Sequence, residues 1–247
     1  MVCLDQSRAE QAAVLSQRLG LPLVGRGDGL ADEFVLEVTP QRLQLGRSGS
    51  RDEPLAVDFS RRRLAQRARG EPLVRAVEGR RSHPRSILDA TAGLGTDAFV
   101  LAQAGHTVTL VERHPDVAAL LDDGLERAGH DPLTHAIAQR MRVVCAEASA
   151  ALDDCSALAA PEVVYLDPLF PPSGKHALPK KAMQWLRILG EQNGDEAALF
   201  AQARRVAREK VVVKRPVRGP FIADQAPDYT IKGRLVRFDV YSHASDR

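Results

Sequence analysis

The sequence predicts an α/β protein built on a doubly wound, mostly parallel sheet, with a small N-terminal α/β appendage. From residue 86 onward, short apolar runs alternate with segments of helical periodicity, the pattern of a parallel sheet with helices on both faces. The run Val163–Leu166 is four consecutive apolar residues, as expected of a strand covered on both faces. With 247 residues, the chain is long enough for one large α/β domain and a smaller unit.

The expected elements follow one another as a series of alternating strands and helices. Strands are expected at residues 86–89, 107–111, 141–145, 163–166 and 210–214, and an antiparallel pair at 229–231 and 235–241. The helices between them are expected at residues 98–103, 115–128, 148–152, 183–189 and 196–208. Before residue 86, we expect helices at 6–19, 61–68 and 73–77 and strands at 34–38, 43–45 and 56–59. The chain therefore divides into a small N-terminal subdomain, a basic helical linker and a main domain, at residues 1–60, 61–85 and 86–247.

The composition argues against several classes of protein. No apolar run approaches the roughly 20 residues of a membrane span, and the N-terminus lacks the basic and apolar segments of a signal peptide. Three scattered cysteines are too few for a disulfide framework, which favours a reducing, cytoplasmic location. The seven histidines show no metal-binding spacing, so we expect no metal.

The predicted linker is strongly basic. Between residues 61 and 85 there are nine arginines and two acidic residues. Arginine suits phosphate contacts, so this segment is a candidate for binding nucleic acid through Arg61, Arg62, Arg63 and Arg67. A solvated helix face explains such a charge run equally well.

A glycine-rich turn follows the strand at 86–89. It has the form Asp89-x-x-x-Gly93-x-Gly95, in which glycines allow a tight turn and close approach of a ligand. Glu112 ends the next strand, where a carboxylate can bind both hydroxyls of a ribose. Glu147 and Ala148 follow the third strand and are expected beside an adenine, although Glu147 alone is as easily an exposed residue at a helix start. Together these residues predict a site for an adenosine-containing cofactor.

The identity of that cofactor follows from charge. Residues 93–98 also fit the G-x-G-x-x-A form of a nicotinamide fingerprint, so the spacing alone does not decide. Two acids, Asp89 and Asp97, flank the turn, and carboxylates repel a pyrophosphate but suit a cation. S-adenosylmethionine carries an ammonium and a sulfonium, so the acids favour it over a dinucleotide.

The strand at 163–166 ends on the turn Asp167-Pro168-Leu169-Phe170. By itself this turn is equally compatible with a plain strand exit. Beside a methyl donor it has a chemical use, because Asp167 and the carbonyl of Pro168 can accept the two hydrogens of an exocyclic amine and so aim its lone pair. Phe170 can stack on an unpaired base. We expect these three residues to be catalytic.

The motifs together resemble one family, the RsmJ family of small-subunit ribosomal RNA guanine-N2 methyltransferases. The resemblance covers most of residues 50–240 and rests on segments 51–54, 89–95, 97–102, 117–125, 163–168 with 170–171, and 210–216. It implies a Rossmann-like class I methyltransferase that acts in the cytoplasm on 16S ribosomal RNA or the 30S particle. It also implies cofactor contacts from Thr96, Asp97, Glu112, Arg113, Glu147, Ala148 and Asp167. Leu169, Thr96 and Glu147 depart from the usual methionine, arginine and small hydroxyl residue of the family.

Further positive charges lie near the predicted catalytic turn. As a group on the rim of the site, they are expected to contact RNA phosphates through Lys175, Lys180, Lys181 and Arg215. Three alternatives stay open from the residues alone: an amino-group methyltransferase acting on DNA or protein, a non-catalytic RNA-binding assembly factor, and a nicotinamide oxidoreductase. The last lacks an obvious proton-transfer histidine near the fourth strand, although His176 is close in sequence.

Overall fold

A computed structural model describes residues 2–3, 6–24, 33–59, 70–80, 82–154, 160–168 and 195–243. The main unit is a seven-stranded sheet with the strand order β6-β5-β4-β7-β8-β10-β9. Its strands are β4 (Ser86–Asp89), β5 (Thr107–Glu112), β6 (Met141–Cys145), β7 (Val163–Leu166), β8 (Lys210–Pro216), β9 (Tyr229–Lys232) and β10 (Val236–Ser242). β10 runs antiparallel to β8 and β9, and the neighbouring pairs from β6 to β8 are parallel. The predicted strands of the main domain are therefore confirmed.

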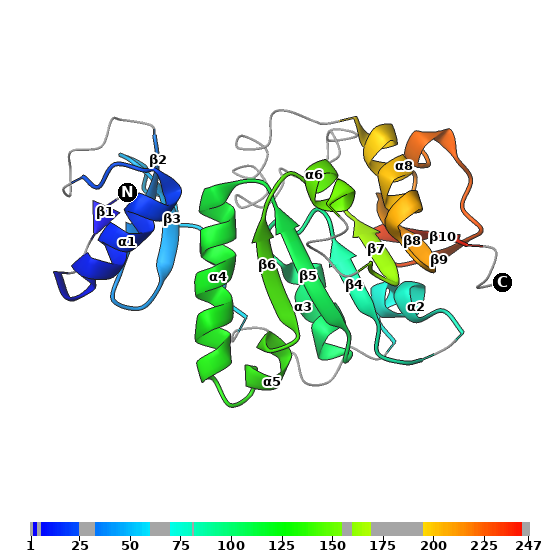
Figure 1. The fold of residues 1–247 in the computed structure, drawn as a ribbon, viewed down its shortest axis with the longest axis horizontal. Helices are drawn as coiled ribbons and strands as arrows, with labels where there is room; N and C mark the ends of the chain where they lie inside the picture. The colour runs from blue at the N-terminus through cyan, green and yellow to red at the C-terminus, as the bar shows by residue number, and fades with distance from the viewer. Residues whose placement is uncertain are drawn as a thin grey trace.

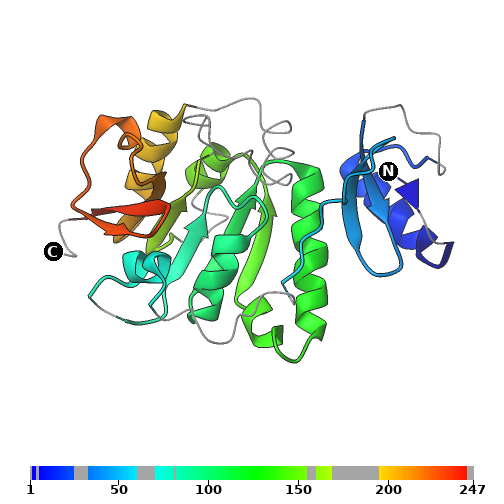
Figure 2. The same cartoon turned by 180° about the vertical axis from the view of Figure 1, so that it is seen from behind.

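Helices cover both faces of this sheet. Its helices are α2 (Pro72–Glu78), α3 (Thr96–Gln103), α4 (Pro115–His130), α5 (His135–Ala138), α6 (Ala148–Asp153) and α8 (Glu196–Val206), and a short 3-10 turn, η2 (Ile222–Asp224), follows β8. Figure 1 shows α6 and α8 in front of the sheet, and Figure 2 shows α2 and α3 on the opposite side. Each face has its own core, in which α2, α3 and α4 contribute to one and α6 and α8 to the other. This is the predicted doubly wound arrangement.

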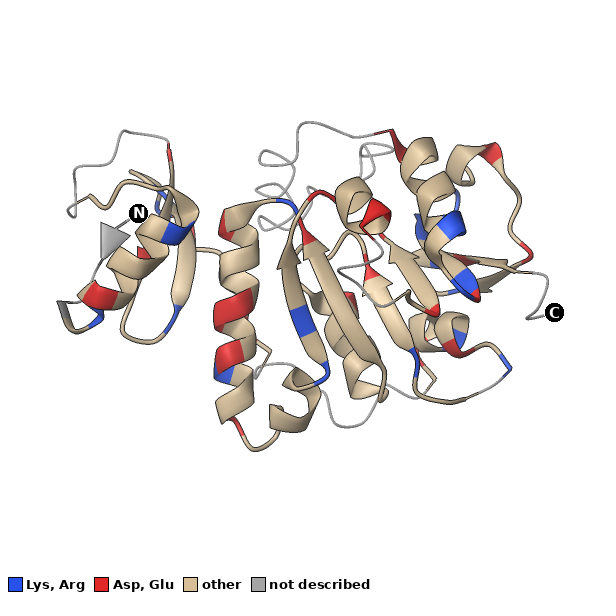
Figure 3. Ribbon diagram, viewed as in Figure 1, with Lys and Arg blue, Asp and Glu red and all other residues tan. Residues whose placement is uncertain are grey.

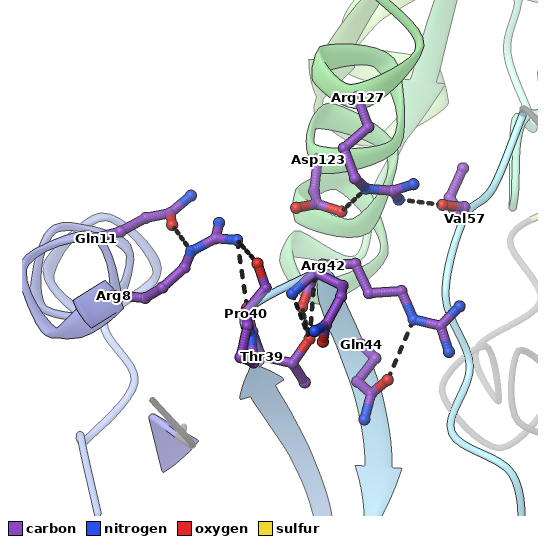
Figure 4. A network of polar contacts seen from close by, with 10 residues as sticks. Arg8, Gln11, Thr39, Pro40, Arg42, Gln44, Val57, Asp123 and Arg127 are labelled. Carbon is purple, nitrogen blue, oxygen red and sulfur yellow. Dashed lines mark hydrogen bonds and ion pairs between the residues drawn. The ribbon is translucent and has the colours of Figure 1, made fainter. Parts of the chain in front are cut away.

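The N-terminal segment forms a second, smaller sheet with the order β1-β2-β3. It consists of β1 (Val2–Cys3), the 3-10 turn η1 (Gln6–Arg8), α1 (Ala9–Leu19), β2 (Phe34–Val38) and β3 (Leu43–Arg47). Arg8 donates to the carbonyls of Thr39 and Pro40, which ties the start of α1 to the turn between β2 and β3, as Figure 4 shows. The predicted helix at 6–19 and the strands at 34–38 and 43–45 are confirmed.

The strand predicted at residues 56–59 is wrong. Only Leu55 makes a bridge, to Leu45, and the chain then continues without strand pairing. Its apolar residues are buried for another reason: Val57 faces α4, and Phe59 stacks on Phe99 of α3 with 4.7 Å between the ring centroids. The alternating apolar residues of segment 56–59 are therefore explained by packing against helices, and the segment is not part of a sheet.

The N-terminal subdomain is attached to the main unit along α4. Arg127 of α4 donates to the carbonyl of Val57 and pairs with Asp123, one turn earlier, as Figure 4 shows. Gly124 lies opposite Val57, and a Cβ at this position would lie 2.5 Å from Cγ1 of Val57. The close approach of the two segments therefore depends on a glycine.

The strand order reverses between β4 and β7. From β4 the chain continues outward through β5 and β6, whereas β7 leads outward through β8 on the other side. Asp89 of β4 is in register with Leu110 of β5 and Tyr165 of β7, so the loops that follow these strands leave the same edge of the sheet. Such a switch point is where open α/β sheets bind their ligands.

The helices predicted at 61–68 and 183–189 lie outside the described residues. The proposed division at residues 60 and 85 stays a prediction, and α2 within the predicted linker packs against β9 and β10. In the described part of the chain, no helix is both long and apolar enough to cross a membrane.

Candidate active site

A cavity of about 560 Å³ opens at the switch point. Ten of the residues predicted to bind cofactor or to act in catalysis line it: Asp89, Gly93, Thr96, Asp97, Glu112, Arg113, Glu147, Ala148, Asp167 and Pro168. They lie at the ends of β4 and β5 or in the segments that follow β4, β5, β6 and β7, and the order of these strands in the sheet brings them together. The far end of the cavity is lined by the start of α8, including Asp195 and Glu196. A cavity of this size is in the usual range for a small-molecule site.

The two glycines of the turn after β4 have different roles. Gly93 has a φ of 51°, lines the cavity and donates its backbone N–H to Glu112 Oε2 at 3.0 Å. Gly95 has a φ of 68° and is not among the residues that line the cavity. A Cβ on Gly95 would lie 2.8 Å from Leu121 and 3.1 Å from Leu110, so this glycine allows α3 to start close to the core.

Glu112 is fixed before any ligand arrives. Oε2 accepts from Gly93 and Oε1 accepts from the backbone N–H of His114 at 2.9 Å. The residue is 8% exposed, and burial raises the pKa of its carboxyl, although the two backbone N–H groups oppose this. A carboxylate offers about four lone-pair positions, so the backbone donors leave acceptor capacity for hydroxyl groups of a ligand.

The residues around Glu112 complete that end of the cavity. Arg113 donates to Nε2 of His114 at 3.1 Å, and burial followed by the charge of Arg113 lowers the pKa of His114. Glu147 precedes α6 and is exposed, and Thr96 opens α3 and is also exposed. His114 was not predicted as a site residue, because it is a single histidine outside any motif.

The turn after β7 is tied to the turn after β4. The backbone N–H of Asp167 donates to Oγ1 of Thr91 at 2.6 Å, and the N–H of Thr91 donates to Asp89 Oδ1 at 3.2 Å. The Asp167 side chain is 33% exposed, and both it and Pro168 line the cavity. Phe170, the third predicted catalytic residue, lies outside the described residues.

Lys214 connects two of the predicted acids. Lys214 itself was not predicted as a site residue. Its Nζ lies 2.7 Å from Asp97 Oδ2 and 2.8 Å from Asp167 Oδ2. The hydroxyl of Tyr165 also donates to Asp97 Oδ2, at 2.6 Å. Lys214 ends an apolar run on β8, just as Asp89, Glu112 and Asp167 end theirs, and this shared position was the signal that could have identified it.

This end of the cavity carries a net negative charge. Burial, followed by the charge of Asp97, raises the pKa of Asp89 well above its usual value and favours its neutral form. With Asp89 neutral, the carboxylates of Asp97 and Asp167 face the ammonium of Lys214. The net charge of these three groups is then one negative charge. Figure 3 shows acidic residues at the strand ends of the central sheet and basic residues on α8 and on β6. An arrangement of this kind attracts a cation.

The structure bears on one of the predicted RNA contacts. Arg215 is 3% exposed and its guanidinium donates to Glu196 Oε2 at 3.2 Å, so it is not available to a phosphate on the surface and that prediction is corrected. The other predicted contacts, Arg61, Arg62, Arg63, Arg67, Lys175, Lys180 and Lys181, lie outside the described residues.

Among the described residues, one group offers metal-ligand atoms close together, and it lies away from the cavity. It consists of His83, Glu162 and Glu209. Glu209 pairs with the buried Arg85, and Glu162 accepts from both the N–H and the hydroxyl of Ser86. These carboxylates already have partners within the protein.

Known proteins resemble this chain over nearly its whole length. A family model described as "Putative SAM-dependent methyltransferase" matches residues 15–243. A ribosomal RNA small subunit methyltransferase J from Pseudomonas aeruginosa (strain UCBPP-PA14) is 43% identical over 244 residues, which are 96% of this chain and 92% of that protein. Its counterpart from Dechloromonas aromatica is 41% identical, over 96% of this chain and 97% of that protein.

A solved structure shares the fold. The crystal structure of a SAM-dependent methyltransferase from Neisseria gonorrhoeae superposes with a TM-score of 0.73 at 32% identity, over 97% of this chain and 95% of that one. The predicted Rossmann-like fold is thereby confirmed.

Proposed function

Because the chain belongs to the ribosomal RNA small subunit methyltransferase J family, we propose that it methylates the exocyclic N2 amine of a guanine in 16S ribosomal RNA. The enzyme depends on S-adenosylmethionine, as its sequence predicted. The observation that carries the proposal is the placement of Asp167 and Pro168 in the same cavity as Glu112 and Gly93. The turn proposed to orient the amine and the carboxylate proposed to bind the nucleoside thus line the same cavity.

The residues present fit the cofactor. Glu112 lines the cavity and offers its remaining lone pairs to the ribose hydroxyls, in an orientation set by backbone N–H groups. Glu147 and Ala148 line the part of the cavity proposed for adenine. The single negative charge shared by Asp97, Asp167 and Lys214 complements the methionine half, whose ammonium, sulfonium and carboxylate sum to one positive charge.

The protein's own groups align the amine. When bound, S-adenosylmethionine would supply a methyl group that the amine nitrogen attacks: the N–C bond forms as the S–C bond breaks, and the sulfur leaves with the electron pair of the broken bond. Asp167 accepts one amine hydrogen and the carbonyl of Pro168 accepts the other, which turns the nitrogen lone pair toward the methyl group. The nitrogen must then lose one proton, and Asp167, which lines the cavity and already accepts one of the amine hydrogens in this proposal, takes it.

Other parts of the proposal concern the RNA. We retain Phe170 as the residue that stacks on the base. The proposed phosphate contacts are Arg61, Arg62, Arg63, Arg67, Lys175, Lys180 and Lys181. The proposed partner is small-subunit ribosomal RNA or the 30S particle, which places the enzyme in the cytoplasm.

The test replaces Asp167 in a strain that lacks the endogenous enzyme. Asp167→Ala should lower methyl transfer to small-subunit RNA by at least about a hundredfold, measured by mass spectrometry of nucleosides. Asp153→Ala removes an exposed carboxylate of α6 that does not line the cavity, and it should leave the N2-methylguanine level unchanged.

Two results would contradict the proposal. A wild-type chain that restores a different methylated nucleoside, or none, would reject guanine N2 in ribosomal RNA as the target. Turnover of Asp167→Ala close to that of the wild type would reject the role of the turn after β7.

A further inference from the structure

The ammonium of Lys214 is shared between two carboxylates on opposite sides of the strand-order reversal. Asp97 lies in the first turn of α3, which follows β4, and Asp167 follows β7. Both Oδ2 atoms lie within 2.8 Å of Lys214 Nζ, and the three side chains are between 21% and 33% exposed. The contacts are short and partly shielded from water, so they are stronger than an exposed ion pair.

In the part of the chain that the structure describes, charged and titratable groups surround Asp167 on several elements. Asp89 comes from β4, Asp97 from α3, Tyr165 from β7 and Lys214 from β8. At the start of α8, Asp195 and Glu196 line the same cavity. Lys214 is the one cation in direct contact with Asp167 among the described residues.

Without that cation, Asp167 would be neutral more often. Burial raises the pKa of Asp167, and the charge of Asp97 raises it further, whereas Lys214 lowers it. Burial alone lowers the pKa of Lys214, but the carboxylates of Asp167 and Asp97 reverse this and hold its pKa above the usual value. Lys214 therefore stays charged across the pH range of an enzyme assay.

We propose that Lys214 is a positioning residue for methyl transfer, which holds Asp167 ionised and engages its Oδ2 so that Oδ1 is left for the substrate amine. This inference rests on the proposed function of Asp167. A protonated Asp167 would turn a donor toward the amine hydrogens and could not take the proton that the nitrogen loses. The role of Lys214 is carried out through Asp167, because its two contacts are both to carboxylates of the protein.

The experiment compares pH profiles of kcat at saturating cofactor. In Lys214→Met, a side chain of similar length without charge, the acid limb should move up by about one pH unit or more, since an adjacent opposite charge lowers a carboxyl pKa by about 1–3 units. Lys214→Arg keeps the charge and should leave the limb near its wild-type position. In Asp97→Asn, the limb should move the other way, to lower pH, because the like charge is removed.

Opposite shifts in Lys214→Met and Asp97→Asn are not expected of residues that only support the fold. An acid limb that stays at its wild-type position in both variants would overturn the proposal. The same titration can be followed without turnover by carbon-13 NMR of aspartate carboxyls, with Asp167 assigned from Asp167→Asn. If the wild type failed to methylate ribosomal RNA, the NMR shift would still test Lys214, so the two failures are distinguishable.

Discussion

Glu112 Oε2 accepts a hydrogen bond of 3.0 Å from the backbone N–H of Gly93, nineteen residues earlier in the chain. The bond joins the end of β5 to the turn after β4, and it uses a donor that only a tight glycine turn presents in this direction. One carboxylate thus shapes the loop and faces the cavity at the same time. The half of the site that we propose for adenosine is consequently built before the cofactor binds.

Replacing Glu112 should weaken cofactor binding. Glu112→Ala removes the acceptor for Gly93 and His114, and we expect the Kd for S-adenosylmethionine to rise at least about tenfold, the effect of one lost charged hydrogen bond. Glu112→Gln should also bind weakly, because its amide NH₂ must face one of two backbone donors. Calorimetry measures both, with Glu126→Ala on the exposed side of α4 as a control. An unaltered Kd in Glu112→Ala would contradict the assigned role.

The buried carboxyl of Asp89 should make the stability of the protein depend on pH. Its pKa in the folded state is raised well above the usual value by burial and then by Asp97, so the folded protein binds a proton that the unfolded chain releases. The resulting stability is present below the unfolded pKa and is lost as pH rises toward the folded pKa, by at most about 1.4 kcal/mol per pH unit.

Asp89→Asn should remove this pH dependence. The amide oxygen can still accept from the N–H of Thr91, so the turn is preserved. Urea unfolding at several values between pH 5 and pH 8 should show a flatter stability curve for the variant than for the wild type. Parallel curves would mean that Asp89 titrates alike in the folded and unfolded states.

Two glycines of α4 should respond in opposite ways to alanine. A Cβ at Gly124 would lie 2.5 Å from Cγ1 and 2.9 Å from Cβ of Val57, so Gly124→Ala should destabilise the protein by about 1–3 kcal/mol despite its higher helix propensity. Gly129 has no atom within 4 Å of the corresponding position, and Gly129→Ala should stabilise by about 0.5–1 kcal/mol.

Urea unfolding of the two variants provides the measurement. In the double variant Gly124→Ala with Val57→Ala, the loss of stability should be smaller than the sum of the two single losses, because Cγ1 of Val57, the nearest atom to the new methyl group, is removed. If Gly124→Ala stabilised the protein as Gly129→Ala does, the close contact between Val57 and α4 would be refuted.

The alternation of strands and helices was predictable because it depends on local patterns. Pro115 opens α4, a run of valines makes β8, and each predicted strand of the main sheet was found. The strand predicted at 56–59 failed because burial against a helix leaves the same apolar pattern as burial in a sheet. The four-residue helix α5 was not predicted, since so short a segment has too little periodicity to be recognised.

The acids of the site were predictable from their positions at strand ends, but their partners were not. Lys214, Tyr165 and Thr91 contact Asp97 or Asp167 only because β4, β7 and β8 are neighbours, and that order is a property of the assembled sheet. Arg215 shows the opposite case, a residue that was predicted to belong to the site rim and does not. It follows Lys214 in sequence, yet alternation along the strand turns it to the opposite face, where it is buried against Glu196.

The order in which the strands are synthesised differs from the order in which they pair. β10 is translated after β8 and β9, yet it lies between them and pairs with β8 from Val236 opposite Pro216 to Ser242 opposite Lys210. Until β10 leaves the ribosome, the outer edge of β8 has no partner and exposes its hydrogen-bonding groups. A nascent chain that ends before residue 236 therefore carries an open sheet edge beside Lys214. Such a fragment is an aggregation hazard, because an unpaired strand edge is a template for pairing with another chain.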